Sequence, residues 1–189
     1  MAVLCGSPRT TSGVGMIVSE RFRDAIASAE RFDDRLMKII VAVEERRCHF
    51  FPAYAPQTGC SEQTKDEFWS LLDEKTAEVP SKDMVVVAGD LNGHVGETKD
   101  GYSCHGGFGY GSRNGDGERI LEYADSHDLT IVNTKFRKRD SHLISFIAGT
   151  PKRRLTMSLL GVATKVLSQT RRPCRMRRLP RNTVHRSAR

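Results

Sequence analysis

Short apolar runs alternate along the chain with amphipathic segments, a pattern that predicts a layered α/β fold. The runs predict strands over Gly15–Ser19, Leu36–Val43, Cys48–Phe51, Met84–Ala88 and Thr130–Val132. The Leu36–Val43 run is apolar on both faces, which is typical of a strand buried between two layers. Pro52 and Pro56 lack an amide N–H, so we expect the chain after Phe51 to leave central sheet pairing and form a loop.

Two segments have the three-to-four spacing of apolar side chains that indicates a helix. Ser61 can cap a helix that runs to Lys75, because its hydroxyl can accept a hydrogen bond from the first turn. A second helix is predicted over Asp116–His127. The segment Arg21–Ala29 fits either a short helix or a connector between strands, and both alternatives stay open.

Length and composition narrow the class of protein. The 189 residues fit one domain, and 38% hydrophobic with 28% charged residues is a globular balance. No apolar run approaches the roughly 18 residues that span a bilayer, and no secretory apolar core forms before Ser7 and Pro8, so we expect an intracellular protein, nuclear or cytoplasmic, with no membrane contact. The five widely spaced cysteines, with no Cys-x-x-Cys, predict free thiols.

The charge is divided unevenly between two regions. Residues 151–189 hold 12 of the 30 Lys and Arg and none of the 23 Asp and Glu, so residues 1–150 carry a net charge of about −5. We therefore expect a domain over 1–150 and a basic tail over 151–189. The spacing of Leu155, Leu159, Val162 and Val166 predicts a short helix in the tail, and 171–189 is expected to be disordered. A basic tail of this kind often binds nucleic acid.

Gly89-Asp90-Leu91-Asn92-Gly93-His94 directly follows the clearest core strand, Met84–Ala88. The carboxyl end of a buried strand is where α/β folds hold catalytic groups rigidly. Asp90 and Asn92 are two residues apart, so they share one face if the extended geometry continues. A carboxylate beside a carboxamide suits phosphodiester hydrolysis, because the carboxylate can accept a proton or bind Mg²⁺ and the amide can orient water or a phosphate oxygen. Taken alone, the motif also suits an ordinary turn.

The surrounding segments occur in a recognisable order. Tyr54-Ala55-Pro56-Gln57-Thr58-Gly59 precedes the first helix, and Asn114 leads the second. Leu129–Thr134 and Ser141-His142-Leu143 follow. Over about residues 10–150 this set resembles the endonuclease/exonuclease/phosphatase superfamily, in particular the apurinic-endonuclease-like domains of LINE-type retrotransposons and the related craniofacial development protein 2-like group.

The resemblance implies a four-layer, DNase I-like α/β sandwich that nicks nucleic acid, DNA more than RNA, with Mg²⁺ as cofactor. Asp90 matches the carboxylate that activates water and contacts the metal, and Asn92 matches its partner. Tyr54 matches a phosphate-contacting tyrosine, and Asn114 corresponds to a further active-site asparagine. The alternative for Tyr54 is a half-buried loop aromatic, and for Asn114 a residue of the helix amino terminus.

The chain departs from the family pattern at both ends. The family's active-site Asn and metal-binding Glu would precede Gly13, and its Ile-Asp-Tyr strand and late catalytic His do not appear. Arg154–Ser158 can be encoded by AGA TTG ACT ATG TCT; reading from one base earlier, on a final C of the preceding codon, gives Gln-Ile-Asp-Tyr-Val. Pro180–His185, as CCA CGC AAC ACC GTC CAC, gives Thr-Gln-His-Arg-Pro in the same frame. We therefore expect an incomplete sandwich with a frame-shifted tail.

The functional expectation is a remnant of a Mg²⁺-dependent phosphodiesterase with weak or absent activity, because the missing groups would cost orders of magnitude in rate. The alternative is a protein that binds nucleic acid through its basic tail without catalysis. A further alternative is a transposon relic with no retained role.

Overall fold

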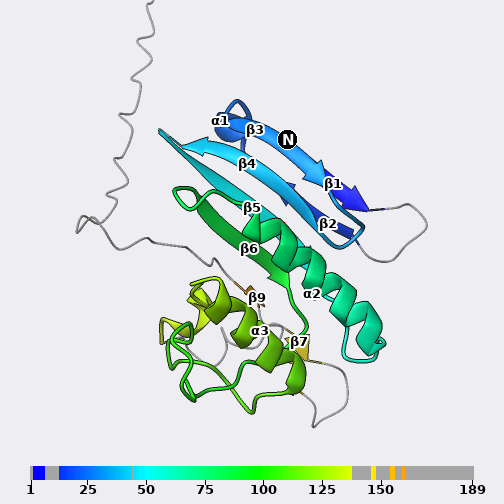
Figure 1. Cartoon of the computed structure of the whole chain (residues 1–189), viewed down its shortest axis with the longest axis vertical. Coiled ribbons are helices and arrows are strands. Elements are labelled where there is room, and N and C mark those ends of the chain that lie inside the picture. The colour runs from blue at the N-terminus through cyan, green and yellow to red at the C-terminus, as the bar shows by residue number, and fades with distance from the viewer. Residues whose placement is uncertain are drawn as a thin grey trace, which may run out of the picture.

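The computed structural model describes residues 2–6, 13–43 and 45–137, together with three two-residue strands further along (Figure 1). The strands are β1 (Ala2–Gly6), β2 (Gly13–Ile17), β3 (Ile26–Arg31), β4 (Met37–Val43), β5 (Arg46–Tyr54), β6 (Met84–Asp90), β7 (Phe146–Ile147), β8 (Arg154–Leu155) and β9 (Leu159–Leu160). The helices are α1 (Glu20–Arg23), α2 (Glu62–Ala77), α3 (Gly115–Ser126) and the 3₁₀ turn η1 (Val132–Thr134).

The main sheet has the order β3-β4-β5-β6-β9. Strands β5 and β6 are parallel neighbours at its centre, connected through α2, and the other pairs are antiparallel. One core cluster joins the sheet to both long helices, with Phe51 and Val87 packed among residues such as Leu72 of α2 and Leu121 of α3. A second cluster joins β4 to Val14 and Met16 of β2. The sheet is therefore covered by helices on one face and by a second pair of strands on the other, which confirms the α/β class.

Most of the predicted elements are present. Strands β4 and β6 confirm the runs at Leu36–Val43 and Met84–Ala88, and β2 lies two residues earlier than predicted. Ser61 caps α2 by accepting a hydrogen bond from the Thr64 amide at 3.2 Å. Helix α3 confirms the second predicted helix, one residue earlier at each end. The open segment Arg21–Ala29 contains the end of α1 and the start of β3.

Pro52 corrects one prediction, because it lies inside the central strand β5, opposite Ala88 of β6. The β4 ladder with β5 ends at the Ile39–Phe50 pair. The Tyr54 amide points to that side, where it donates to the Arg35 carbonyl at 2.8 Å, and the Pro52 nitrogen faces the same side two residues earlier. Proline is tolerated here because its missing N–H falls in a gap of the ladder.

Two further expectations are wrong. Thr130–Val132 is not a strand: Ile131 makes one isolated bridge to His105, and the chain then turns into η1, where the Thr134 hydroxyl donates to the Ile131 carbonyl at 2.7 Å. The predicted tail helix is replaced at Arg154–Leu155 and Leu159–Leu160 by strand pairing. Strand β9 gains sheet hydrogen bonds with the edge of β6, and β8 gains them with the short strand β7, which a single amphipathic helix with Gly161 does not offer. The rest of the tail, including 171–189, and the segment around His142 lie outside the described residues.

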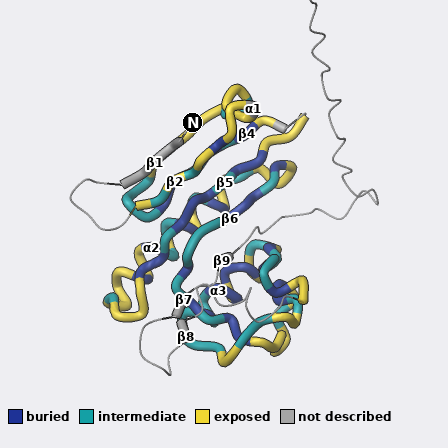
Figure 2. Tube along the Cα trace, turned by 180° about the vertical axis from the view of Figure 1, so that it is seen from behind, coloured by how far each residue is buried: buried dark blue, intermediate teal, exposed yellow. Residues whose placement is uncertain are grey.

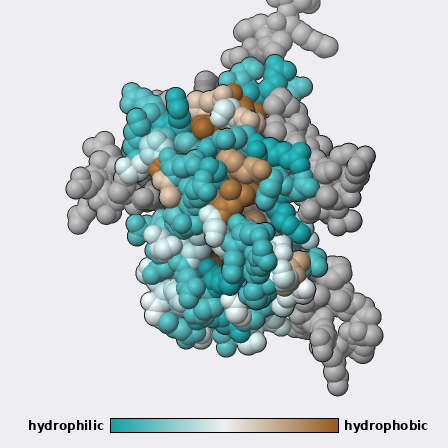
Figure 3. All heavy atoms as spheres, turned by 45° about the vertical axis from the view of Figure 1, so that its right-hand side comes forward, coloured by the Kyte–Doolittle hydropathy of each residue, from teal (hydrophilic) through white to brown (hydrophobic). Residues whose placement is uncertain are grey.

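Burial is greatest at the centre, as Figure 2 shows for β5, β6 and α3. In the Leu36–Val43 run, Leu36 is buried, and so are Met37, Ile39 and Val41, which share one face of the strand. Ala42, on the other face, is exposed, so the prediction that both faces are buried holds for one face only. The face in Figure 3 is largely hydrophilic, with a small hydrophobic patch in the half that carries the strands. Within the described part of the chain, no helix has the length and apolar character needed to cross a bilayer.

Candidate active site

Asp90 and Tyr54 are register partners at the carboxyl ends of the parallel strands β6 and β5. Neighbouring strands lie about 4.8 Å apart, so the two residues occupy adjacent positions on one edge of the sheet. Both are half-buried. The Ala55 amide continues the ladder by donating to the Asp90 carbonyl at 2.9 Å, and the Tyr54 hydroxyl accepts a hydrogen bond from the Gln57 side chain at 3.2 Å. The structure therefore brings together two residues that are 36 positions apart in the sequence.

Gly89 makes this close pairing possible. Its φ of +150° is rare for residues with a side chain, and a Cβ atom built there would lie 1.8 Å from the Ala53 carbonyl oxygen. The glycine in the motif therefore allows β5 and β6 to approach directly before the two candidate site residues.

Asn92 lies beside Asp90 through a turn rather than through a continued strand. Strand β6 ends at Asp90, and Asn92 has a left-handed φ of +50°. Its amide donates to Asp90 Oδ1 at 2.9 Å, and its side chain donates to the Ala55 carbonyl at 2.7 Å. Leu91, between them, is 1% exposed and anchors the turn in the core. The expected extended geometry is thus wrong, but an Asx turn keeps the carboxylate and the carboxamide together.

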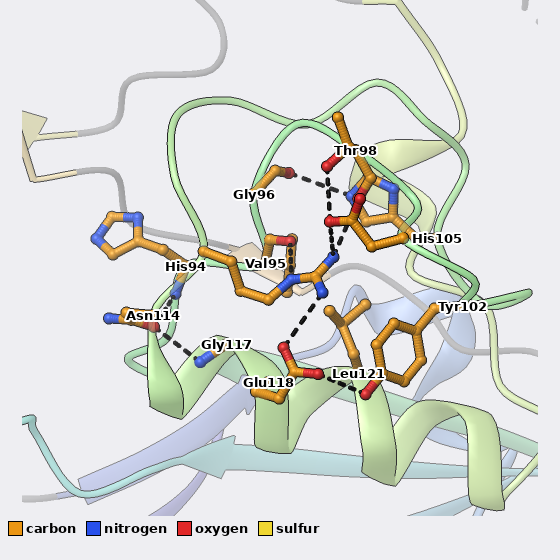
Figure 4. Close-up of polar contacts among 12 residues, drawn as sticks. His94, Val95, Gly96, Thr98, Tyr102, His105, Asn114, Gly117, Glu118 and Leu121 are labelled. Carbon is orange, nitrogen blue, oxygen red and sulfur yellow. Dashed lines mark hydrogen bonds and ion pairs between the residues drawn. The ribbon is translucent and has the colours of Figure 1, made fainter.

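The loop after Asn92 rests directly on the amino terminus of α3. Cβ atoms built at Gly93 and Gly117 would lie 2.6 Å from Ile120 and 1.8 Å from the His94 carbonyl oxygen. Asn114 caps α3 by accepting from the Gly117 amide at 2.8 Å, and it accepts from the His94 amide at 3.0 Å (Figure 4). Asn114 therefore joins the helix to the loop, which is its expected alternative as a residue of the helix amino terminus. The contacts of its carboxamide oxygen do not include Asp90 or Tyr54.

Arg113 holds the remainder of this loop, and Figure 4 labels its partners Val95, Thr98 and Glu118. Its guanidinium donates to the carbonyls of Val95 and Thr98 at 3.1 Å each and pairs with Glu118 of α3 at 3.2 Å. The Tyr102 hydroxyl donates to the same Glu118 carboxylate at 2.6 Å, and this hydrogen bond raises the pKa of Tyr102 to about 12. These contacts fix the loop that follows the Asp90 turn to helix α3.

Arg35 belongs to the same edge of the sheet and was not identified from the sequence. Its carbonyl accepts from the Tyr54 amide, and its guanidinium carbon lies 5.3 Å from the centre of the Tyr54 ring. The sequence feature that could have indicated Arg35 as a site residue is its position immediately before the predicted strand Leu36–Val43. Recognising it required the pairing of Leu36 with Ala53, which the sequence pattern does not specify.

The donor atoms near Asp90 fall short of a complete cation site. Among the described residues no group of three or more His, Cys, Asp or Glu side chains converges in a way that could hold a metal. Asp90 supplies a carboxylate, and one of its oxygens already accepts from the Asn92 amide. Mg²⁺ needs octahedral oxygen coordination and often takes one or two carboxylates with water and substrate phosphates. These residues therefore do not form a Mg²⁺ site by themselves.

Comparison with known proteins finds similarity in fold and in sequence. The structure superposes on the endonuclease domain of TRAS1, a telomere-specific non-LTR retrotransposon, with a TM-score of 0.53 and 9% identity, covering 86% of this chain and 66% of that domain. The sequence is 27% identical to craniofacial development protein 2 of Bos taurus and 25% identical to that of Tragulus javanicus, each over 135 residues. The chain therefore shares its fold with this retrotransposon endonuclease domain. No family model matches it.

The alignment covers 71% of this chain but 23% of each craniofacial development protein 2 sequence. The aligned segment therefore corresponds to about a quarter of the length of those relatives. Within that fold, Asp90, Asn92 and Tyr54 form one constellation at the carboxyl ends of β5 and β6.

Proposed function

We propose that this chain is a weakened phosphodiesterase of nucleic acid, with Asp90, Asn92 and Tyr54 as the remaining site. The observation that supports it most is the register pairing of Tyr54 with Asp90 directly after Gly89. A phosphate bound at this edge would meet a phenol hydroxyl on one strand and a carboxylate on the next. Asp90 can accept a proton from water there, while Asn92 holds the turn in place.

The activity is proposed to be low because this set has one carboxylate and, among the described residues, Asp90 belongs to no converging group of three or more His, Cys, Asp or Glu side chains. Mg²⁺, when bound, would neutralise phosphate charge and polarise the scissile linkage. Asp90 would be its protein ligand, and weak metal affinity follows from so few donor oxygens. Asn114 enters this proposal as a support for the loop at His94.

Nicking of supercoiled plasmid by the purified full chain, with and without Mg²⁺, tests the proposal. We expect slow, Mg²⁺-dependent nicking that Asp90→Asn abolishes, since the amide preserves the shape of the turn and removes the base. Asp128→Asn is the matched control, because Asp128 is exposed, has a φ of +54° that asparagine tolerates, and lies after α3.

Equal nicking by wild type and Asp90→Asn would contradict the assignment of the site. Rates typical of complete nucleases would contradict the proposed weakness. Absence of nicking with retained DNA binding would favour the second candidate, a non-catalytic nucleic-acid-binding protein.

That second candidate is supported by the composition of residues 151–189, with 12 basic and no acidic side chains. Strand β9 of this tail pairs with Gly89 and Asp90 of β6, which places a segment flanked in sequence by basic residues beside the site. If the tail alone binds, deleting 151–189 removes binding and Asp90→Asn leaves it unchanged. The coding DNA separately tests whether the tail is frame-shifted: codons for 153–158 that do not yield Gln-Ile-Asp-Tyr-Val one base earlier would overturn that explanation.

A further inference from the structure

We propose that Arg35 is a phosphate-binding residue of this site and contacts a nucleic-acid phosphate next to the one that Tyr54 and Asp90 would meet. This inference rests on the proposed function and extends it from the reacting groups to the path of the substrate strand. It assigns a binding role to a residue that neither the motif nor the turn at Asp90 includes.

The backbone places Arg35, Tyr54 and Asp90 in a row. Tyr54 donates its amide to the Arg35 carbonyl at 2.8 Å on one side and pairs in register with Asp90 on the other. Since adjacent strands are about 4.8 Å apart, Arg35 and Asp90 are separated by about two strand spacings along one edge. A polynucleotide has a phosphate at every nucleotide, so a strand that crosses this edge presents more than one anion to it.

Among the described residues, the side chain of Arg35 makes one cation–π contact and one long hydrogen bond, both with Tyr54. Its guanidinium carbon lies 5.3 Å from the Tyr54 ring centre, a cation–π contact that favours one orientation. Among the described residues its hydrogen bond is a long one, from Nη1 to the Tyr54 carbonyl at 3.4 Å. A guanidinium has five N–H donors, so most remain available for an anion. Arginine on an aromatic ring, with a free fork of donors, is well suited to phosphate.

Nearby carboxylates do not neutralise Arg35. Asp33 turns back to accept from the amides of Arg35 and Leu36, both at 2.7 Å, and Asp34 pairs with Arg31. No ion pair of Arg35 is formed within the part of the chain that the structure describes, although two acidic residues precede it directly. The carboxylate of Asp33 thus stabilises the turn of this loop, and that of Asp34 pairs with Arg31.

The surface beside Arg35 is hollowed. Residues 31–35 line an open depression of about 580 Å³, and this lining contains Arg31 and Arg35 as well as Asp33 and Asp34. An open depression with Arg35 in its lining has room for a sugar-phosphate segment, whereas a closed apolar cavity would exclude one.

Fluorescence anisotropy with a short labelled DNA duplex, without metal so that no cleavage occurs, tests the inference on the full chain. Arg35→Gln should weaken binding roughly tenfold, as expected for one charge-assisted contact. It should also reduce the slope of log Kd against log salt by about 0.9, the value for one duplex phosphate. Arg35→Lys should restore the slope but only part of the affinity, because the charge returns without the fork.

Arg46→Gln is the matched control, since it removes one exposed positive charge at the end of β5 opposite to Tyr54. It should leave the slope unchanged within error. Weaker binding by Arg35→Gln with an unchanged slope would show that Arg35 acts by packing on Tyr54, and would overturn the inference. Binding by Arg35→Gln equal to that of Arg46→Gln would overturn it as well. Failure of the wild-type chain to bind duplex at low salt would overturn both this inference and the proposed function, whereas binding without nicking would overturn only the catalytic part.

Discussion

Replacing Gly89 with alanine should disrupt the central strand pair at the candidate site. The added Cβ would lie 1.8 Å from the Ala53 carbonyl oxygen, where real Cβ contacts essentially never fall below 3.0 Å. One strand must therefore move by about 1.2 Å, the difference between these two distances. The atom it meets belongs to the backbone of β5, so a side-chain rotation cannot relieve the contact.

Two costs add at this position. A φ of +150° is strained for a residue with a side chain, by about 1–3 kcal/mol. Forcing extra volume into a packed region costs about 1–3 kcal/mol more. The expected loss in the free energy of unfolding is therefore about 2–6 kcal/mol, against a typical total of about 5–15 kcal/mol.

Urea unfolding followed by far-UV circular dichroism measures this loss. With an m value of about 2 kcal/mol/M, a loss of 3 kcal/mol lowers the midpoint by about 1.5 M. Gly59→Ala is the matched control, because a Cβ there meets no atom within 4 Å. That variant should change stability by less than about 1 kcal/mol. The reasoning is refuted if Gly89→Ala unfolds at the same midpoint as Gly59→Ala.

Three further predictions concern the rest of the scaffold. His105 is fully buried, and burial lowers its pKa, so the unfolded chain binds a proton more readily than the folded chain. The free energy of unfolding should therefore fall as the pH drops below about 6.5. Urea titrations at several pH values should show this dependence for the wild type and not for His105→Gln. Burial raises the pKa of Cys48 and Cys104 from 9.0 to about 11, so stability should decline from about pH 9 upward, and mass-mapped thiol alkylation under native conditions should modify Cys60 before Cys48 and Cys104. Ser61→Ala removes the cap of α2 and should cost about 1 kcal/mol in urea unfolding, with a cost near zero contradicting the capping geometry.

The sequence was sufficient to predict those elements whose local conformational preference agrees with their burial. Met84–Ala88 is β-branched, short and continuous, and it becomes the central strand β6. The hydroxyl of Ser61 and the carboxamide of Asn114 cap helices at the predicted positions, because their side chains compensate amides that the helix leaves unpaired. These features depend on a few neighbouring residues, so the sequence pattern specifies them directly.

The errors come from sheet pairing, which depends on distant segments. Pro52 fits a central strand because the β4 ladder stops before it, a fact about register rather than about proline. Ile131 has strand-like neighbours but finds one bridging residue, so the chain turns instead. Leu155 and Leu159 have helical spacing, yet Leu155 pairs with Phe146 of β7 and Leu159 pairs with Asp90 of β6. Such choices are decided by which partner is present in three dimensions.

The candidate site shows the same division. The position of Asp90 after a core strand was evident from its motif, and Tyr54 joins it as expected from the resemblance to the superfamily. The left-handed turn at Asn92 was not evident, since asparagine allows this conformation without requiring it. Arg35 was missed because its proximity to Tyr54 arises from the isolated bridge between Leu36 and Ala53.

The proposed combination of retained binding and weak chemistry follows from where each capacity resides. Binding of phosphate needs donors and positive charge on a fixed edge, and Arg35 and Tyr54 obtain their places from backbone pairing within β3–β6. Hydrolysis needs several groups that act in concert, and removing one member of such a set costs far more than its share. Removing the single carboxylate, that of Asp90, is thus expected to lower the turnover rate much more than the affinity for nucleic acid. On this proposal the scaffold binds nucleic acid but cuts it slowly.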